Sequence, residues 1–80
     1  MQITTGLVSA VVGSQTVTGN ASVDWSQVTE GSWLVLSGQI YPISAVNALA
    51  KTLTLAEKFA GASNVTNVAY VIVRDFTPNH

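Results

Sequence analysis

Apolar residues along this chain come in short runs that Gly, Ser, Thr and Asn interrupt. Such runs, bounded by turn residues, are typical of the strands of a small barrel or sandwich. Gly13-Ser14 would turn the first hairpin, and Ser37-Gly38 the hairpin between the third and fourth strands. The pattern predicts an all-β fold, a small, partly open antiparallel β-barrel or sandwich of five to six strands. The strands are expected at residues 6–12, 15–19, 32–37, 39–47, 52–55 and 69–75.

Two segments do not fit a strand. Residues 22–30 are expected to form one short helical or 3₁₀ turn, which Ser22 or Asp24 could cap before Gly31 releases the chain. Residues 56–63 are expected to form a loop. Pro42 lacks a backbone donor, which predicts that its strand lies at an edge or carries a bulge there.

Hydrophobic alternation fails in the segments SWLVL and AYVIV, because both faces of each predicted strand are apolar. A sheet face in contact with water would alternate apolar with polar residues. We therefore expect one face to pack on the domain's own core and the other on a neighbouring chain. The outer residues, which form the predicted assembly interface, are Trp33, Val35, Val71 and Val73.

The inner face defines a candidate core. Trp25 lies in a polar segment, and we expect its indole to plug an open end of the barrel; stacking on a sugar ring is the alternative. For Trp33 the alternatives are a contact between subunits and a glycan platform, which aromatic character alone does not separate. The predicted core is Val8, Val17, Trp25, Val28, Leu34, Leu36, Tyr41, Ile43, Val46, Leu53, Leu55, Phe59, Tyr70 and Ile72.

Composition favours self-association. The 80 residues predict one domain, with an N-terminal arm at 1–5 and a C-terminal tail at 76–80. A chain this short is marginally stable alone. It contains no Cys, so disulfides cannot stabilise it, and oligomerisation is the remaining common way to do so. Only 9% of residues are charged and the net charge is -1, which argues against nucleic acid as a partner. No apolar run reaches the ~20 residues of a membrane span.

Candidate chemistry is sparse. The single His, His80, is the last residue, so neither a hydrolase triad nor a histidine metal site is indicated. We expect no enzymatic activity, no metal and no cofactor. The four acidic residues are expected to be solvated loop positions rather than a glycosidase pair. Two glycosylation sequons begin at Asn20 and Asn64, and we interpret both as chance matches.

Several short motifs together resemble a family. They are TVTG at 16–19 followed by Trp25, EGSWLVLSG at 30–38, IYPISAV at 40–46, LTL at 53–55, FAGAS at 59–63 and AYVIVRDF at 69–76, then TPN at 77–79. Their order resembles a small β-rich module near the N-termini of bacteriophage tail fibres and related virion proteins. The chain departs from it at Glu30 and Ser32, where the family often has Pro and Asp, and both positions are expected at the surface of a turn.

The resemblance implies a structural protein located in the virion. Its expected role is to join a tail fibre or similar appendage to the particle, as a homotrimer in contact with other virion proteins. Two alternatives remain: a receptor-binding module that grips surface glycan, and a capsid decoration or collar protein.

Overall fold

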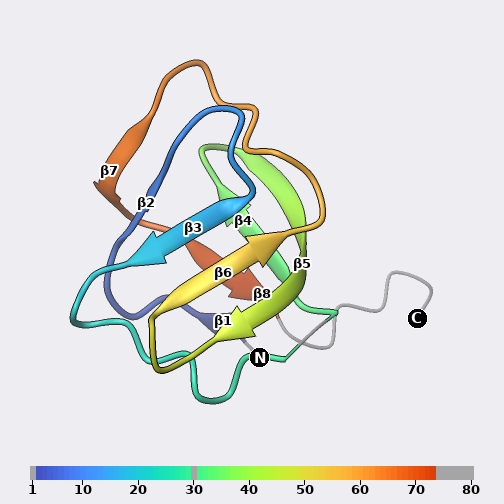
Figure 1. Cartoon of the computed structure of the whole chain (residues 1–80). Coiled ribbons are helices and arrows are strands. Elements are labelled where there is room, and N and C mark those ends of the chain that lie inside the picture. The colour runs from blue at the N-terminus through green and yellow to red at the C-terminus, as the bar shows by residue number, and fades with distance from the viewer. Residues whose placement is uncertain (1, 30, 74–80) are drawn as a thin grey trace.

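The computed structural model describes residues 2–29 and 31–73, and this part of the chain folds as a single antiparallel sheet of eight strands without a helix. In spatial order the strands run β1-β8-β4-β5-β6-β3-β2-β7. Figure 1 shows β3 and β6 on the near side and β4 and β8 behind them, so the sheet curls around one interior. The strands are β1 (Gln2–Ile3), β2 (Val8–Ala10), β3 (Thr16–Gly19), β4 (Trp33–Leu36), β5 (Gln39–Asn47), β6 (Thr52–Leu55), β7 (Val65–Val68) and β8 (Val71–Val73).

The core follows from the two-residue period of the strands. In β4, β6 and β8, every second residue is buried, because successive side chains point to opposite faces of a sheet. All the predicted core residues are buried except Val46, which packs partly exposed against the others. Ile3, Ala10 and Val23 complete the core and were not predicted.

A β-bulge in β5 lets one long strand serve both halves of the curled sheet. The first half of β5 pairs with β4, and the second half pairs with β6, with a register shift between Ile43 and Ala45. Both Ser44 and Ala45 are exposed, so the next inward side chain after Ile43 is Val46, three positions later. Such a bulge bends the strand, which allows the sheet to wrap around its core.

The strand count differs from the expected five to six because the first and last strands are each broken. Ile3 pairs with Ile72 in β8, and Ala10 pairs with Val65 in β7, so residues 2–10 run antiparallel to residues 65–73. Regular pairing stops at residues 4–7, where Gly6 has a φ of 81°. The predicted strands at 6–12 and 69–75 were thus too long at 6–7, 11–12 and 69–70. Residues 74–75 and the tail at 76–80 lie outside the described residues.

The expected barrel is also corrected. No strand pairing among the described residues joins β1 to β7, so the sheet does not close. The two strands that the sequence did not predict are β1, which falls in the expected N-terminal arm, and β7. Both are hard to detect, because β1 has two residues and β7 (VTNV) has one left-handed residue, Asn67, with a φ of 51°.

The expected helical turn at 22–30 is absent from the described residues. Backbone hydrogen bonds instead close successive reverse turns: Val23 donates to Asn20 at 3.2 Å, Val28 to Trp25 at 3.0 Å and Ser32 to Thr29 at 3.3 Å. Each bond spans three residues and none continues into a helix. The side chain of Asp24 accepts from the backbone N–H of Ser26, two residues on, which favours a local turn over a helix.

Of the two alternatives expected for Pro42, the bulge is confirmed and the edge position is not, whereas the expectation for Ser32 was wrong. Pro42 lies between β4 and β6 in the interior of the sheet, and the bulge follows it. Its missing donor costs no pairing with β6, because that pairing begins at Ile43. Ser32, expected at the surface, is buried, and its carbonyl accepts a hydrogen bond from the Ile43 N–H at 2.9 Å.

Gly6 offers a test of the break between β1 and β2. A Cβ there would stand 2.7 Å from the Val23 backbone N, on a left-handed backbone. Gly6→Ala should therefore cost more than the ~1–2 kcal/mol of left-handed strain alone. Gly13→Ala is the matched control, since Gly13 has a φ of 86° and nothing within 4 Å of its Cβ. Urea unfolding of both variants measures the difference, and equal losses would contradict the close packing at Gly6.

Candidate assembly surface

The structure brings the four predicted interface residues together on the outer face of β4 and β8. Trp33 pairs with Val73, and Val35 pairs with Val71. All four are partly exposed, whereas their neighbours Leu34, Leu36 and Ile72 are buried. The sequence alternation therefore placed these side chains on the correct face.

Ile40 extends this face onto β5 and was missed. It pairs with Val35 across the Ser37-Gly38 turn and is 58% exposed. The signal was present in the sequence, because Ile40 alternates with Tyr41 and must point away from the core that Tyr41 enters. Ser37 and Gly38 both have positive φ, as the expected two-residue turn requires.

A shallow hollow of about 40 Å³ opens on this face. Its lining is wholly apolar and consists of Trp33, Val35, Ile40 and Val73; we call it the outer hollow. A volume of roughly 10–15 Å³ holds one water-sized group, so there is room for the branched end of one aliphatic side chain. Apolar surface is driven out of contact with water, which makes the outer hollow a natural contact for another apolar group.

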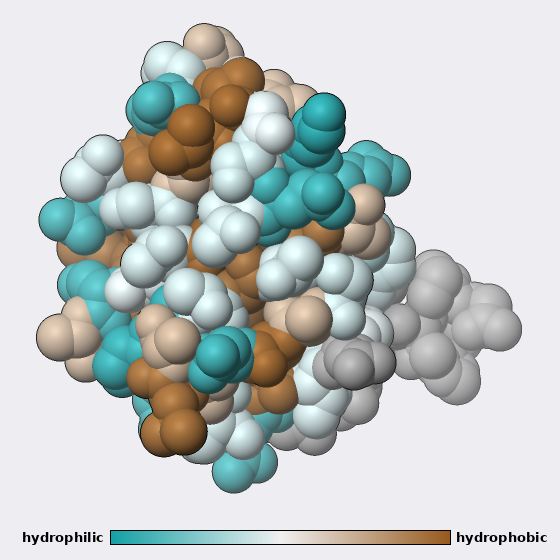
Figure 2. All heavy atoms as spheres, viewed as in Figure 1, coloured by the Kyte–Doolittle hydropathy of each residue, from teal (hydrophilic) through white to brown (hydrophobic). Residues whose placement is uncertain are grey.

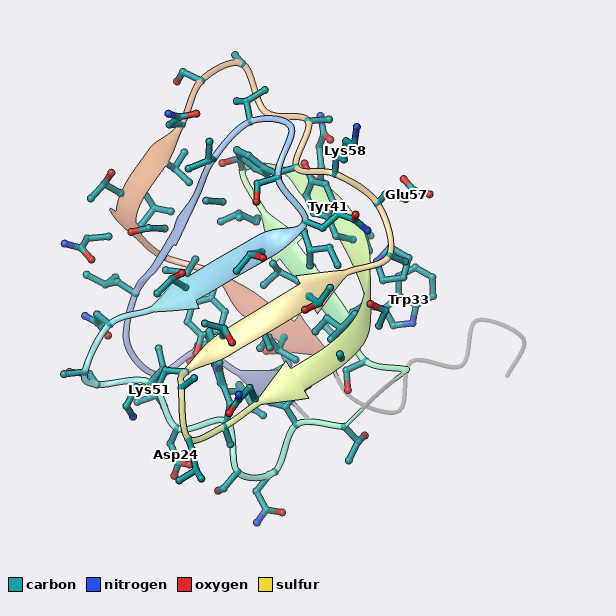
Figure 3. The ribbon with its side chains drawn as sticks, viewed as in Figure 1. Asp24, Trp33, Tyr41, Lys51, Glu57 and Lys58 are labelled. Atoms are coloured by element: carbon teal, nitrogen blue, oxygen red, sulfur yellow. The ribbon has the colours of Figure 1, made fainter. Side chains whose placement is uncertain are left out.

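The loop after β6, which carries two charged residues, is tied to the strand that carries Ile40. The Ala56 N–H donates to the Pro42 carbonyl at 2.9 Å, which holds the loop after β6 beside the strand that carries Ile40. Figure 3 shows Glu57 and Lys58 above Trp33, in the same part of the view. An apolar centre with a polar rim is the usual anatomy of a protein interface.

Trp25 occupies a different place from Trp33. It is 2% exposed, and its Nε1–H donates to the Tyr70 hydroxyl at 3.0 Å. The two rings meet edge to face, with their centroids 6.0 Å apart. The Tyr70 hydroxyl in turn donates to the Thr5 carbonyl at 2.6 Å, in the break between β1 and β2. Trp25 is therefore enclosed, and a sugar ring has no access to its face.

Because of the buried Tyr70 hydroxyl, we expect the free energy of unfolding to fall at alkaline pH. Burial raises the pKa of Tyr70 above its ordinary value of 10.0. The unfolded chain therefore loses this proton first, and the stability that the neutral hydroxyl contributes is lost as the pH rises from 10 through the higher folded pKa.

Tyr70→Phe tests this limit. The variant should lose about 1–3 kcal/mol at neutral pH, because the Trp25 donor and the Thr5 carbonyl lose their partner. Above pH 10 its stability should fall less steeply than that of the unmutated protein. Chemical denaturation at a series of pH values measures both effects, and parallel pH profiles would contradict the assignment to Tyr70.

A second group of polar contacts lies at the far end of β5. The Lys51 Nζ donates to the Val23 carbonyl at 2.9 Å, and the Lys51 carbonyl accepts from the Gly19 N–H at 2.8 Å. Asp24 lies nearby, and hydrogen bonds from the Ser26 hydroxyl and N–H hold the pKa of its exposed carboxyl below the usual range. Figure 3 shows Lys51 and Asp24 on the side of the molecule opposite Trp33.

The described part of the chain gathers no three His, Cys, Asp or Glu side chains that could hold a metal ion. Among residues 2–29 and 31–73, no helix has the length and apolar character that crossing a membrane demands. Glu30 and His80 lie outside the described residues. The Asn20 side chain is engaged, since its Oδ1 accepts from Leu7 and Ser22; the Asn64 Oδ1 accepts from Val12.

No family model, curated protein or solved structure matches this chain. The likeness to phage tail-fibre modules therefore rests on the sequence motifs quoted above.

Proposed function

We propose that this chain is a structural module of a bacteriophage virion, which joins a tail fibre or similar appendage to the particle and assembles with copies of itself as a homotrimer. The observation that carries the assembly is the outer hollow, an apolar site on strands whose other face already forms the core. The virion setting is supported by the ordered motifs from TVTG to AYVIVRDF. The role is non-enzymatic.

The composition supports assembly as well. Only 9% of the residues are charged, against about 25% in a typical soluble domain, so little charge repulsion opposes contact between copies. The apolar outer face adds a favourable term, since burying apolar surface releases about 25 cal/mol for each Å².

The glycan-binding alternative is less well supported. A sugar site combines an aromatic ring with polar groups that fix the hydroxyls. The four side chains that line the outer hollow are all apolar. Trp25, the other aromatic candidate, is buried.

Imaging of intact particles tests the role. A tagged copy of the chain, located by gold labelling in electron micrographs, should appear where a fibre or appendage meets the particle. Label spread over the capsid shell would favour a decoration protein instead, and particles without label would contradict a virion role. A glycan array with Trp33→Ala as control tests the receptor alternative, and binding that this variant loses would support it.

A further inference from the structure

The outer hollow is large enough for one aliphatic side chain, and the same molecule presents such a side chain elsewhere. Leu49 is 98% exposed, the highest exposure among the large hydrophobic residues of the described chain. It stands in the turn between β5 and β6, at residues 47–51, which we call the Leu49 tip. Figure 2 shows hydrophobic surface at the lower left of the molecule, over this turn.

The Leu49 tip is held firmly by its neighbours. The Asn47 Oδ1 accepts from the Ala50 N–H at 3.0 Å, which closes the turn on itself. Lys51 then takes a left-handed φ of 58°, and its side chain and carbonyl bind the Val23 carbonyl and the Gly19 N–H. A side chain on a rigid turn loses little freedom when it is buried in a partner, which favours binding.

One molecule cannot bring its own Leu49 to its own outer hollow. Ile40 lies near the start of β5 and Leu49 follows its end, about 20 Å of strand apart. Figure 3 shows the two ends on opposite sides, marked by Trp33 and Lys51. Any contact between them joins two molecules.

The charges at the two ends are compatible with such a contact. Lys51 belongs to the Leu49 tip, and Figure 3 shows Asp24 in the same part of the view, whereas Glu57 and Lys58 lie in the part that holds Trp33. Among the residues that the structure describes, each end thus has one acidic and one basic residue, so opposite signs can face each other when the ends meet.

Building on the proposed self-assembly, we propose that Leu49 of one copy inserts into the outer hollow of the next, between Ile40, Val35 and the Trp33 ring. The contact is heterologous, because it joins two different surfaces of the chain. Heterologous contacts close into rings when the rotation allows it, and a ring of three such contacts gives the proposed trimer.

Two single variants test the two halves of the contact. Leu49→Lys removes the tip, and Ile40→Lys blocks the outer hollow; both side chains are exposed, so both variants should fold. The control is Val11→Lys, which introduces the same charge at a residue that is 54% exposed in another loop. A contact of one side chain with one hollow buries less surface than the ~800 Å² per partner of a standard interface, so it is expected to be weak. Light scattering is therefore recorded over a series of concentrations.

Each of the two variants should raise the concentration needed for half-assembly about tenfold or more, while Val11→Lys should not change it. The decisive sample is an equimolar mixture of Leu49→Lys and Ile40→Lys. One variant keeps the hollow and the other keeps the tip, so the mixture should form dimers and nothing larger. A protein that carries both substitutions has neither the tip nor an open hollow, so it should form no dimer with either single variant.

Other outcomes overturn the inference. If Leu49→Lys assembles like the unmutated protein while Ile40→Lys does not, the inserted group is not Leu49, and the proposed self-assembly stands without it. A mixture that gives no dimer also contradicts the heterologous contact. If the unmutated protein stays monomeric throughout the concentration series, the proposed self-assembly fails as well.

Discussion

Ile72→Lys is expected to unfold the domain. Ile72 is completely buried in β8, opposite Ile3 and Leu34 in the neighbouring strands. An ammonium group placed there without a partner costs several kcal/mol, and the whole stability of a small domain is about 5–15 kcal/mol. The circular dichroism spectrum should lose its β-sheet signal, with no cooperative thermal transition.

Two control variants separate the effect of the buried position from the effect of the added charge. Val73→Lys introduces the same charge one residue away on the outer face and should keep the fold. Ile72→Val keeps the site apolar and should cost only about 0.5–1.5 kcal/mol. A folded Ile72→Lys protein, or an unfolded Val73→Lys protein, would contradict the assignment of the two faces.

Trp25→Ala should produce the second large effect. The indole is enclosed under the turns at residues 20–29, and its removal leaves a cavity and an unpaired Tyr70 hydroxyl lone pair. Removal of a buried tryptophan costs about 3–5 kcal/mol. Guanidinium unfolding monitored by circular dichroism measures this loss.

Trp33→Ala is the matched control for Trp25→Ala. The Trp33 ring is partly exposed on the outer face, so the same truncation should lower the free energy of unfolding by a clearly smaller amount. Similar losses for the two variants would show that the division between core and surface tryptophan is wrong.

The alternation of side chains made the two faces of the sheet predictable. In β4 and β8, Leu34 and Ile72 enter the core, and Trp33 and Val73 point outward, as the two-residue period requires. The strands β5 and β6 were predicted with their observed bounds, which lie on either side of the turn at residues 48–51, and the two-residue turn at Ser37-Gly38 precedes β5. Burial of Trp25 was also expected, since a large ring in a polar segment needs cover.

Sequence alone missed the features that depend on distant contacts. β1 is two residues long and forms because Gln2 and Ile3 pair with β8, which is distant in sequence. The segment at 22–29 forms turns rather than a helix, because Val23 and Trp25 must reach the core near Gly6 and Gly19. The outer hollow was only partly predicted, since Ile40 joins it through a cross-strand pair.

The central claim is that the outer face of β4 and β8 binds a second copy of the chain. Light scattering on a sizing column, with the unmutated protein and Val71→Lys/Val73→Lys side by side, tests it most directly. The unmutated protein should elute as an oligomer with the mass of a trimer. The double variant should elute as a folded monomer with an unchanged β-sheet spectrum. An unmutated protein that remains monomeric at high concentration, or a double variant that assembles equally well, would contradict the claim.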